Sequence, residues 1–239
     1  MSAYVGEFLG TMLLVFLGNA SVANVLLKNS KAEGAGWVVI AFAWGIALTL
    51  CIYGFGHISG AHFNPALTIA LAIGGSFDSS LVAGYVVAQL AGAFCGGAAV
   101  YLYFLPHFNL TEDVGLKLAS FSTGPAIRNT PSNFFCEAVG TFILVYGVLV
   151  IGAAEFVQGL NPIAIGCLLM GIGLSLGGTT GYALNPARDL GPRLFHALFP
   201  IKGKGSSDWG YAWIPVFAPI VGAIVAVLVR AAFVNWGFN

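Results

Sequence analysis

The chain has 239 residues, of which 58% are hydrophobic and 8% are charged, and its mean hydropathy is +0.90. This composition excludes an ordinary water-soluble domain and is typical of an integral membrane protein. Nine basic residues balance nine acidic ones, so there is no basic field to attract nucleic acid.

Six apolar windows are long enough to be spanning helices, because a hydrocarbon core of about 30 Å requires about 20 residues. In the first window, "GEFLG" places an acidic residue inside the apolar stretch, so the segment does not resemble a cleaved signal peptide and we expect it to remain as a span. Most charged residues lie in the connections. The windows are residues 4–27, 36–56, 80–104, 132–153, 160–178 and 211–235.

Two shorter apolar segments, residues 65–74 and 186–198, each begin with Asn-Pro-Ala. Both are too short to cross the membrane, so we expect two half-helices that enter from re-entrant loops. Proline suits a first helical turn and asparagine caps it. The positive ends of the two half-helix dipoles would face each other at the midplane, with the asparagine N–H₂ groups free to donate to a solute. The motif residues are Asn64, Pro65, Ala66, Asn185, Pro186 and Ala187.

The chain also repeats itself. "GEFLGTMLLVFLGNA" resembles "CEAVGTFILVYGVLV", and "SGAHFNPALT" resembles "TGYALNPARD". Each half holds three spans and one half-helix, and an odd number of spans inverts the second half relative to the first. The predicted fold is an all-α membrane protein with six transmembrane helices plus two re-entrant half-helices. Residues 1–239 form one domain, divided into repeats 1–104 and 132–239 with a connecting loop at 105–131.

The segments "SGAHFNPALTIA", "GYALNPARDLGPR" and "PIVGAIVA" resemble the major intrinsic protein family of aquaporins and glycerol facilitators, and the resemblance covers nearly the whole chain. It implies an aquaporin-like fold, a pore in each subunit, a homotetramer in the cell membrane, and both termini in the cytoplasm. The positive-inside rule predicts the opposite orientation from the connections, and we follow the resemblance. The basic residues concerned are Lys28, Lys31, Lys117, Arg128, Lys202 and Lys204.

The resemblance implies an aromatic/arginine selectivity filter at Trp44, Gly173, Tyr182 and Arg188. Water-selective members have a histidine where Gly173 stands, so the glycine is expected to leave room for a polyol. Tyr182 stands where the glycerol-conducting branch often has phenylalanine, which leaves the exact solute range open.

Three further residues match the glycerol-conducting branch, namely Asp189, Arg193 and Pro215. Gly124 departs from it, because an aromatic residue is common at that position.

Arg188 is the residue whose chemistry points most clearly to function, because a guanidinium in a membrane span costs roughly 2.5–3.5 kcal/mol and is usually functional. Its rigid donor fork can bind two adjacent hydroxyl groups. Stripping a hydroxyl of water costs ~2–7 kcal/mol without replacement, so a row of backbone carbonyls is expected to line the path. The predicted carbonyls belong to Gly60, Ala61, His62, Gly181, Tyr182 and Ala183.

Glu7 and Glu137 occupy equivalent places in the two halves. We expect them to support the re-entrant loops by accepting backbone N–H groups; a proton relay is the alternative.

The sequence thus predicts a passive channel for glycerol, water and other small uncharged solutes, extending to hydrogen peroxide and protonated lactic acid. Ions and protons would be excluded. No nucleophile–base pair, metal-ligand spacing or cofactor motif is present, so an enzyme is not expected, and neither a metal nor a cofactor is implied. Three further readings stay open: a water-selective channel, a coupled secondary transporter, which also uses inverted repeats and broken helices, and a scaffold protein with a closed pore.

Overall fold

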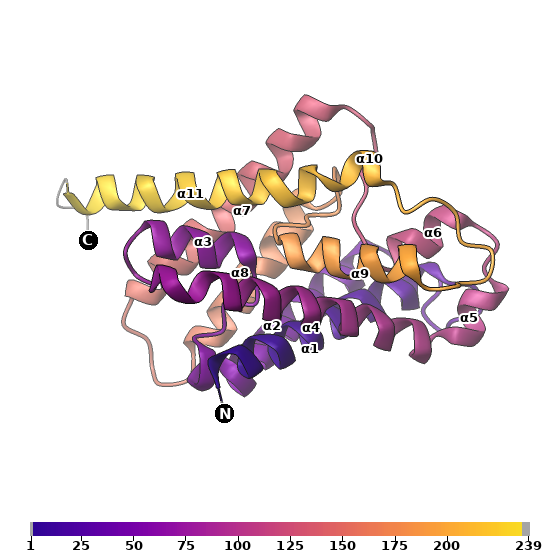
Figure 1. Cartoon of the computed structure of the whole chain (residues 1–239), viewed down its shortest axis with the longest axis horizontal. Coiled ribbons are helices and arrows are strands. Elements are labelled where there is room, and N and C mark those ends of the chain that lie inside the picture. Colours follow the sequence, from indigo (N-terminus) through magenta and orange to yellow (C-terminus); the bar gives the residue numbers. More distant parts are fainter. Residues whose placement is uncertain (1, 236–239) are drawn as a thin grey trace.

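The structure of the chain, a computed structural model, describes residues 2–235, among which there is no β-strand. Long helices run roughly along the long axis of the molecule (Figure 1). They are α1 (Ala3–Leu26), α2 (Trp37–Ser59), α4 (Val82–Tyr103), α7 (Thr130–Ala153), α8 (Asn161–Leu176) and α11 (Ile214–Asn235). The half-helices are α3 (Pro65–Ile73) and α9 (Pro186–Leu198). Short helical turns are η1 (Ser79–Leu81), α5 (Leu105–Leu110), α6 (Val114–Ala119) and α10 (Trp209–Ala212).

Within the described residues, five helices are long and apolar enough to cross a membrane, and α8 is shorter. Its 16 residues extend about 24 Å at 1.5 Å per residue. The fifth expected span, residues 160–178, is therefore present as a helix that ends two residues earlier. The helix ends before Gly177, where a Cβ atom would lie 2.5 Å from the Tyr182 ring. The chain turns back there and places that ring against α8.

The two halves pack as structural copies. Helix α1 meets α4 at Gly92, where a Cβ atom would lie 2.3 Å from the carbonyl oxygen of Phe8. Helix α7 meets α11 in the same way at Gly222, 2.0 Å from the carbonyl oxygen of Ala138. Each residue of the second contact lies 130 positions after its equivalent in the first. The sequence repeat therefore corresponds to a repeated helix pair.

Helices α2 and α8 cross where the two halves meet. A Cβ atom at Gly45 would lie 2.7 Å from the Gly166 carbonyl oxygen, and one at Gly166 would lie 2.6 Å from the Gly45 carbonyl oxygen. These glycines are 121 positions apart, as are Asn64 and Asn185. Residues of α2, α3 and their connecting loop thus have counterparts 121 positions later.

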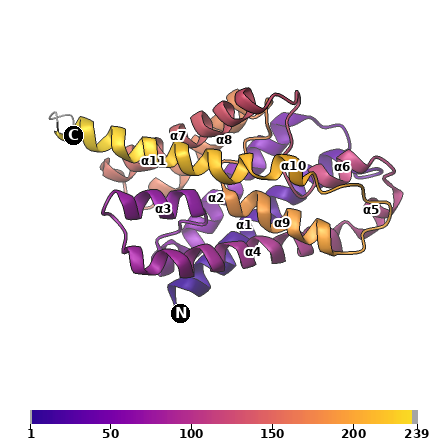
Figure 2. The same ribbon diagram turned by 45° about the horizontal axis from the view of Figure 1, so that its top comes forward.

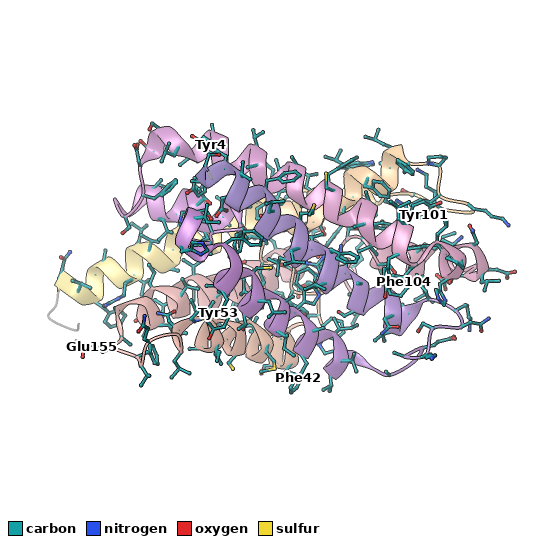
Figure 3. The ribbon with its side chains drawn as sticks, turned by 90° about the horizontal axis from the view of Figure 1, so that it is seen from below. Tyr4, Phe42, Tyr53, Tyr101, Phe104 and Glu155 are labelled. Carbon is teal, nitrogen blue, oxygen red and sulfur yellow. The ribbon has the colours of Figure 1, made fainter. Side chains whose placement is uncertain are left out.

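The two ends of the molecule differ. The connections 27–36, 104–129 and 199–208 gather with α5 and α6 at one end, here called the loop end (Figure 2). The chain termini and the turns around residues 74–81 and 154–160 lie at the other, the terminal end. Tyr101 and Phe104 lie toward the loop end and Glu155 toward the terminal end (Figure 3).

Two lysines of the loop end bind backbone carbonyl groups. Lys117 Nζ donates to the carbonyl of Lys202 at 2.5 Å. Lys204 Nζ donates to three carbonyls at the C-terminal end of α9, including that of His196 at 2.6 Å. A cation at a helix C-terminus satisfies unpaired carbonyls and the helix dipole. These positive charges therefore stabilise local structure, a role that the positive-inside count does not consider.

Candidate functional site

The two re-entrant loops, residues 59–64 and 180–185, have the same unusual backbone. Counted from the glycine of each loop, the first, second and fourth residues adopt positive φ, at closely matching angles for the glycines (82° and 84°) and the fourth residues (52° and 54°). Positive φ at a non-glycine residue costs about 1–3 kcal/mol and persists only where the surroundings impose it. The residues with positive φ are Gly60, Ala61 and Phe63 in the first loop and Gly181, Tyr182 and Leu184 in the second.

Glu7 holds the first loop. Its fully buried carboxylate accepts the backbone N–H groups of His62 at 3.0 Å and Phe63 at 2.7 Å. It also accepts the Ser59 hydroxyl and the Gln89 side-chain amide, each at 2.7 Å. Four donors on one carboxylate compensate for its burial.

Glu137 holds the second loop from the equivalent position on α7. Its carboxylate accepts the N–H groups of Ala183 and Leu184, each at 3.0 Å. A proton relay needs a donor and acceptor that can exchange partners, whereas both carboxylates are occupied by loop N–H groups. The geometry therefore favours a supporting role for Glu7 and Glu137.

The asparagines cap the half-helices with their side-chain oxygens. Asn64 Oδ1 accepts the N–H of Ala66 at 2.8 Å, and Asn185 Oδ1 accepts the N–H groups of Ala187 at 3.0 Å and Arg188 at 3.2 Å. The prolines Pro65 and Pro186 occupy the first turn, where a missing N–H is tolerated.

The asparagine amides differ from expectation. Asn64 Nδ2 donates to the Leu184 carbonyl at 2.9 Å, and Asn185 Nδ2 donates to the Phe63 carbonyl at 2.7 Å. Each amide thus binds the opposite re-entrant loop, so the idea that both N–H₂ groups are wholly free is wrong. One N–H of each remains for a solute, because an amide nitrogen carries two hydrogens.

Two cavities meet inside the molecule. The first, of about 180 Å³, extends from the paired asparagines past Ala61 and His62 and along apolar residues of α2, α3, α7 and α8. The second, of about 380 Å³, opens beside residues 119–124 of the loop end. Tyr182 and Arg188 line both cavities. These two side chains therefore stand at the junction of the two cavities.

Arg188 packs against Trp44 at this junction. Its guanidinium carbon lies 4.4 Å from the centre of the Trp44 ring, which is cation–π geometry. Arg188 is 6% exposed. Its Nη1 lies 3.4 Å from Oδ1 of Asn19, and this is its one side-chain hydrogen bond to residues 2–235. The remaining N–H groups are available to a molecule in the cavities.

Gly173 does not line either cavity. A Cβ atom there would lie 3.0 Å from the Tyr182 ring and 3.2 Å from Ala41. The Trp37 indole N–H donates to the Gly173 carbonyl at 2.8 Å, and the Trp37 ring packs edge-on against Tyr182. The room that glycine leaves is therefore filled by Tyr182, which corrects the expectation that this space is open to a solute.

The predicted carbonyl residues follow the cavities. Ala61, His62, Tyr182 and Ala183 line the first cavity together with Gly60, and Gly181 lines the second. Pro215 is buried in the first turn of α11 and lines neither.

Asp189 and Arg193 form a fully buried ion pair on α9, at 2.8 Å. Asp189 accepts the Thr123 backbone N–H at 2.7 Å and its hydroxyl at 2.6 Å. Arg193 donates to the carbonyls of Thr123 and Ser207, each at 2.7 Å. The pair therefore fixes two loop-end connections, one of which forms a wall of the second cavity.

The sequence profile of the family described as Major intrinsic protein matches residues 1–230. The chain belongs to the major intrinsic protein family. It is a multi-pass integral membrane channel and not an enzyme.

Relatives within the major intrinsic protein family are similar over nearly their whole length. A probable glycerol uptake facilitator protein of Thermotoga maritima is 53% identical over 238 residues and is covered completely, as is this chain. The glycerol uptake facilitator protein of Bacillus subtilis is 53% identical over 98% of this chain and 85% of its own. The X-ray structure of the aquaglyceroporin from Plasmodium falciparum superposes with a TM-score of 0.83 at 31% identity, covering 94% of this chain and 93% of that one.

Proposed function

We propose that the protein conducts glycerol, water and other small uncharged solutes down their gradients and excludes ions and protons. The observation that carries the proposal is the junction at Tyr182 and Arg188, where a guanidinium with unused N–H groups lies against the Trp44 ring. A polyol has hydroxyls on one side and carbon on the other. The guanidinium suits the hydroxyls and the ring suits the carbon.

Two further polar atoms support this solute class. Trp44 Nε1 and the Tyr182 hydroxyl are buried and have no hydrogen-bond partner within residues 2–235. A buried polar atom without a partner costs about 1–3 kcal/mol, and a hydroxylated solute in the filter would relieve that cost. The names of the similar bacterial proteins state glycerol uptake as their function.

In this proposal the selectivity filter consists of Trp44, Tyr182 and Arg188, with Gly173 providing the space behind Tyr182. The loop carbonyls and the two asparagine amides replace water along the rest of the path. A homotetramer with a pore in each subunit, and termini in the cytoplasm, belong to the same proposal. Hydrogen peroxide and protonated lactic acid fit it as small neutral donors of hydrogen bonds.

A water-selective channel is the second candidate. It is favoured by the Tyr182 ring, which takes up the space beside Gly173. Stopped-flow light scattering on proteoliposomes distinguishes the two, with empty liposomes as the control. We expect the protein to raise both water and glycerol permeability; water permeability alone would support the second candidate.

The same vesicles distinguish a channel from a coupled transporter and from a closed scaffold. A coupled transporter would accumulate radiolabelled glycerol against its gradient when an ion gradient is imposed, and a closed scaffold would transport no solute. We expect uptake that stops at equal concentrations inside and outside.

A further inference from the structure

The filter arginine has little to hold it in place. Its guanidinium is in contact with the face of Trp44, and its one side-chain hydrogen bond to the described part of the chain is the contact with Asn19 at 3.4 Å. That distance is at the long end for a hydrogen bond. An arginine side chain has about 2 kcal/mol of rotamer entropy, so the partners that remain decide where the guanidinium lies.

Asn19 is a fully buried residue of α1, a helix that contributes no residue to the predicted filter. Its Oδ1 faces Arg188, and its Nδ2 donates to the Phe121 carbonyl at 2.8 Å. The strong second bond fixes the orientation of the amide, since the carbonyl accepts only from the nitrogen side. The oxygen is therefore presented to the guanidinium.

Gly18, the residue before Asn19, makes room for the Trp44 ring, the other side chain of the proposed filter. A Cβ atom at Gly18 would lie 2.4 Å from three atoms of the Trp44 ring. Only glycine allows the indole to lie this close to α1. Gly18 and Asn19 thus place Trp44 and Arg188, respectively, against the same turn of α1.

The other half of the molecule has no equivalent polar pair. The counterpart of Asn19 is Leu149 and that of Arg188 is Leu67. Both leucines pack against the apolar cluster that contains Val145. The half that contains the arginine therefore also contains the asparagine that accepts from it, and the half without the arginine has a leucine instead of the asparagine.

We propose that Asn19 is a positioning residue of the selectivity filter, which holds the Arg188 guanidinium against the wall beside Trp44 and so determines polyol selectivity. The inference rests on the proposed function. With Asn19 in place, the guanidinium presents a fixed donor fork to two hydroxyl groups. Without Asn19, the Arg188 side chain moves within the junction, and a bound polyol has to fix its position at a cost in free energy.

The test is the glycerol-to-water permeability ratio of Asn19→Leu in proteoliposomes. Leucine has a similar size but neither accepts from Arg188 nor donates to Phe121. We expect the ratio to fall about three- to tenfold, the worth of about one net hydrogen bond. Asn19→Ala removes the same atoms and replaces the leucine variant should that fail to fold. Asn19→Asp loses the donor to Phe121 and adds a negative charge, but either carboxylate oxygen can accept from Arg188. Its ratio should therefore stay within about twofold of the parent.

A double-mutant cycle with Arg188→Val shows whether Asn19 acts through the arginine. In the Arg188→Val background, Asn19→Leu should leave the ratio unchanged, because the residue it positions is gone. A further fall of the same size as in the parent would overturn the proposal.

Asn133→Leu is the matched control. Asn133 is also a buried asparagine whose Nδ2 donates to a carbonyl of the same connection, that of Ile127 at 3.1 Å. It has no contact with Arg188, so its ratio should remain that of the parent. An equal fall in Asn133→Leu, or in Asn19→Asp, would assign the effect to loop anchoring and overturn the proposal.

If the parent protein passes no glycerol, the proposed function fails. If the parent passes glycerol and Asn19→Leu keeps the parental ratio, only the role of Asn19 fails.

Discussion

The two ends of the channel are built on one backbone but carry different side chains. The re-entrant loops share their positive φ positions, their glutamate supports and their asparagine caps. The four proposed filter positions, in contrast, have apolar counterparts 121 positions earlier or later, and all four counterparts line the first cavity. Trp44 corresponds to Ile165, Gly173 to Ile52, Tyr182 to Ala61 and Arg188 to Leu67.

This comparison separates two tasks. The duplicated backbone provides a path with carbonyls and half-helix ends, and it does so equally from both sides. In the proposed function, selection depends on side chains that differ between the halves, which concentrates it at the loop end. Changes at the filter should therefore alter which solutes pass, and the same changes at the counterparts should not.

The largest expected difference between the halves concerns stability. Asp189 and Arg193 form a buried ion pair, whereas their counterparts in α3 are Thr68 and Ala72. Asp189→Ala leaves Arg193 buried and unpaired, which costs about 3–5 kcal/mol. We expect a much lower unfolding temperature in detergent than for the control Thr68→Ala. An unfolding temperature of Asp189→Ala equal to that of the parent would show that the second half does not depend on its ion pair.

A second prediction concerns the features that both halves share, because two positive half-helix ends meet at the midplane. Their positive potential repels cations, and an anion would have to shed its hydration in a narrow channel of low dielectric, so only neutral acid should pass. For lactic acid, with a carboxyl pKa near ~3.5–4, the neutral fraction falls about tenfold for each unit of rising pH above that range. Uptake of labelled lactate at fixed total concentration should fall about a hundredfold from pH 5 to pH 7, while glycerol uptake stays flat. Constant lactate uptake would mean that the anion is carried.

A third prediction addresses Gly173 and its neighbour. An imidazole at this position collides with the Tyr182 ring and pushes it into the junction, so Gly173→His should lower glycerol flux about tenfold relative to water flux, a typical steric discrimination. Adding Tyr182→Ala should recover part of the glycerol flux. Gly178→His is the control, because a Cβ atom at Gly178 would have nothing within 4 Å. Equal loss of water and glycerol flux in Gly173→His would indicate misfolding instead.

The smallest expected effect concerns proton exclusion. Arg188→Val removes one fixed charge, worth about 1 kcal/mol at 4 Å in a water-like dielectric, so proton leak should rise roughly fivefold. Leu67→Val at the counterpart position should have no effect. Leak can be followed with a pH-sensitive dye inside proteoliposomes. An unchanged leak in Arg188→Val would assign the barrier to the half-helix dipoles alone.

Much of the architecture could be predicted from the sequence because it follows from local patterns. Apolar windows locate the spans, and the Asn-Pro-Ala repeats locate α3 and α9 to within one residue. The matching positions of Glu7 and Glu137 already indicate a shared role in loop support. These features follow from the length of the apolar windows and from the repeated motifs, both of which can be read from a single sequence.

Other features depend on contacts between distant residues and could not be predicted. Asn19 is a polar residue inside an apolar span, which indicates a buried partner, but that partner, Arg188, lies 169 positions away and the local sequence does not identify it. Whether the space at Gly173 is open depends on the rotation of Tyr182, which is set by the turn after α8. The cross-loop bonds of the asparagine amides likewise require the two loops to be placed against each other.

Those cross-loop bonds have a consequence for biosynthesis. The amide of Asn64 donates to the carbonyl of Leu184, 120 residues later in the chain, and the carbonyl of Phe63 accepts from the amide of Asn185, 122 residues later. At about 5–20 residues per second, the ribosome needs roughly 6 to 24 s to supply these partners. During that time the first re-entrant loop has polar groups without their final partners and depends on water, lipid headgroups or the insertion machinery. The centre of the pore can therefore form only after α1 to α8 have been synthesised, while α11 is still to follow.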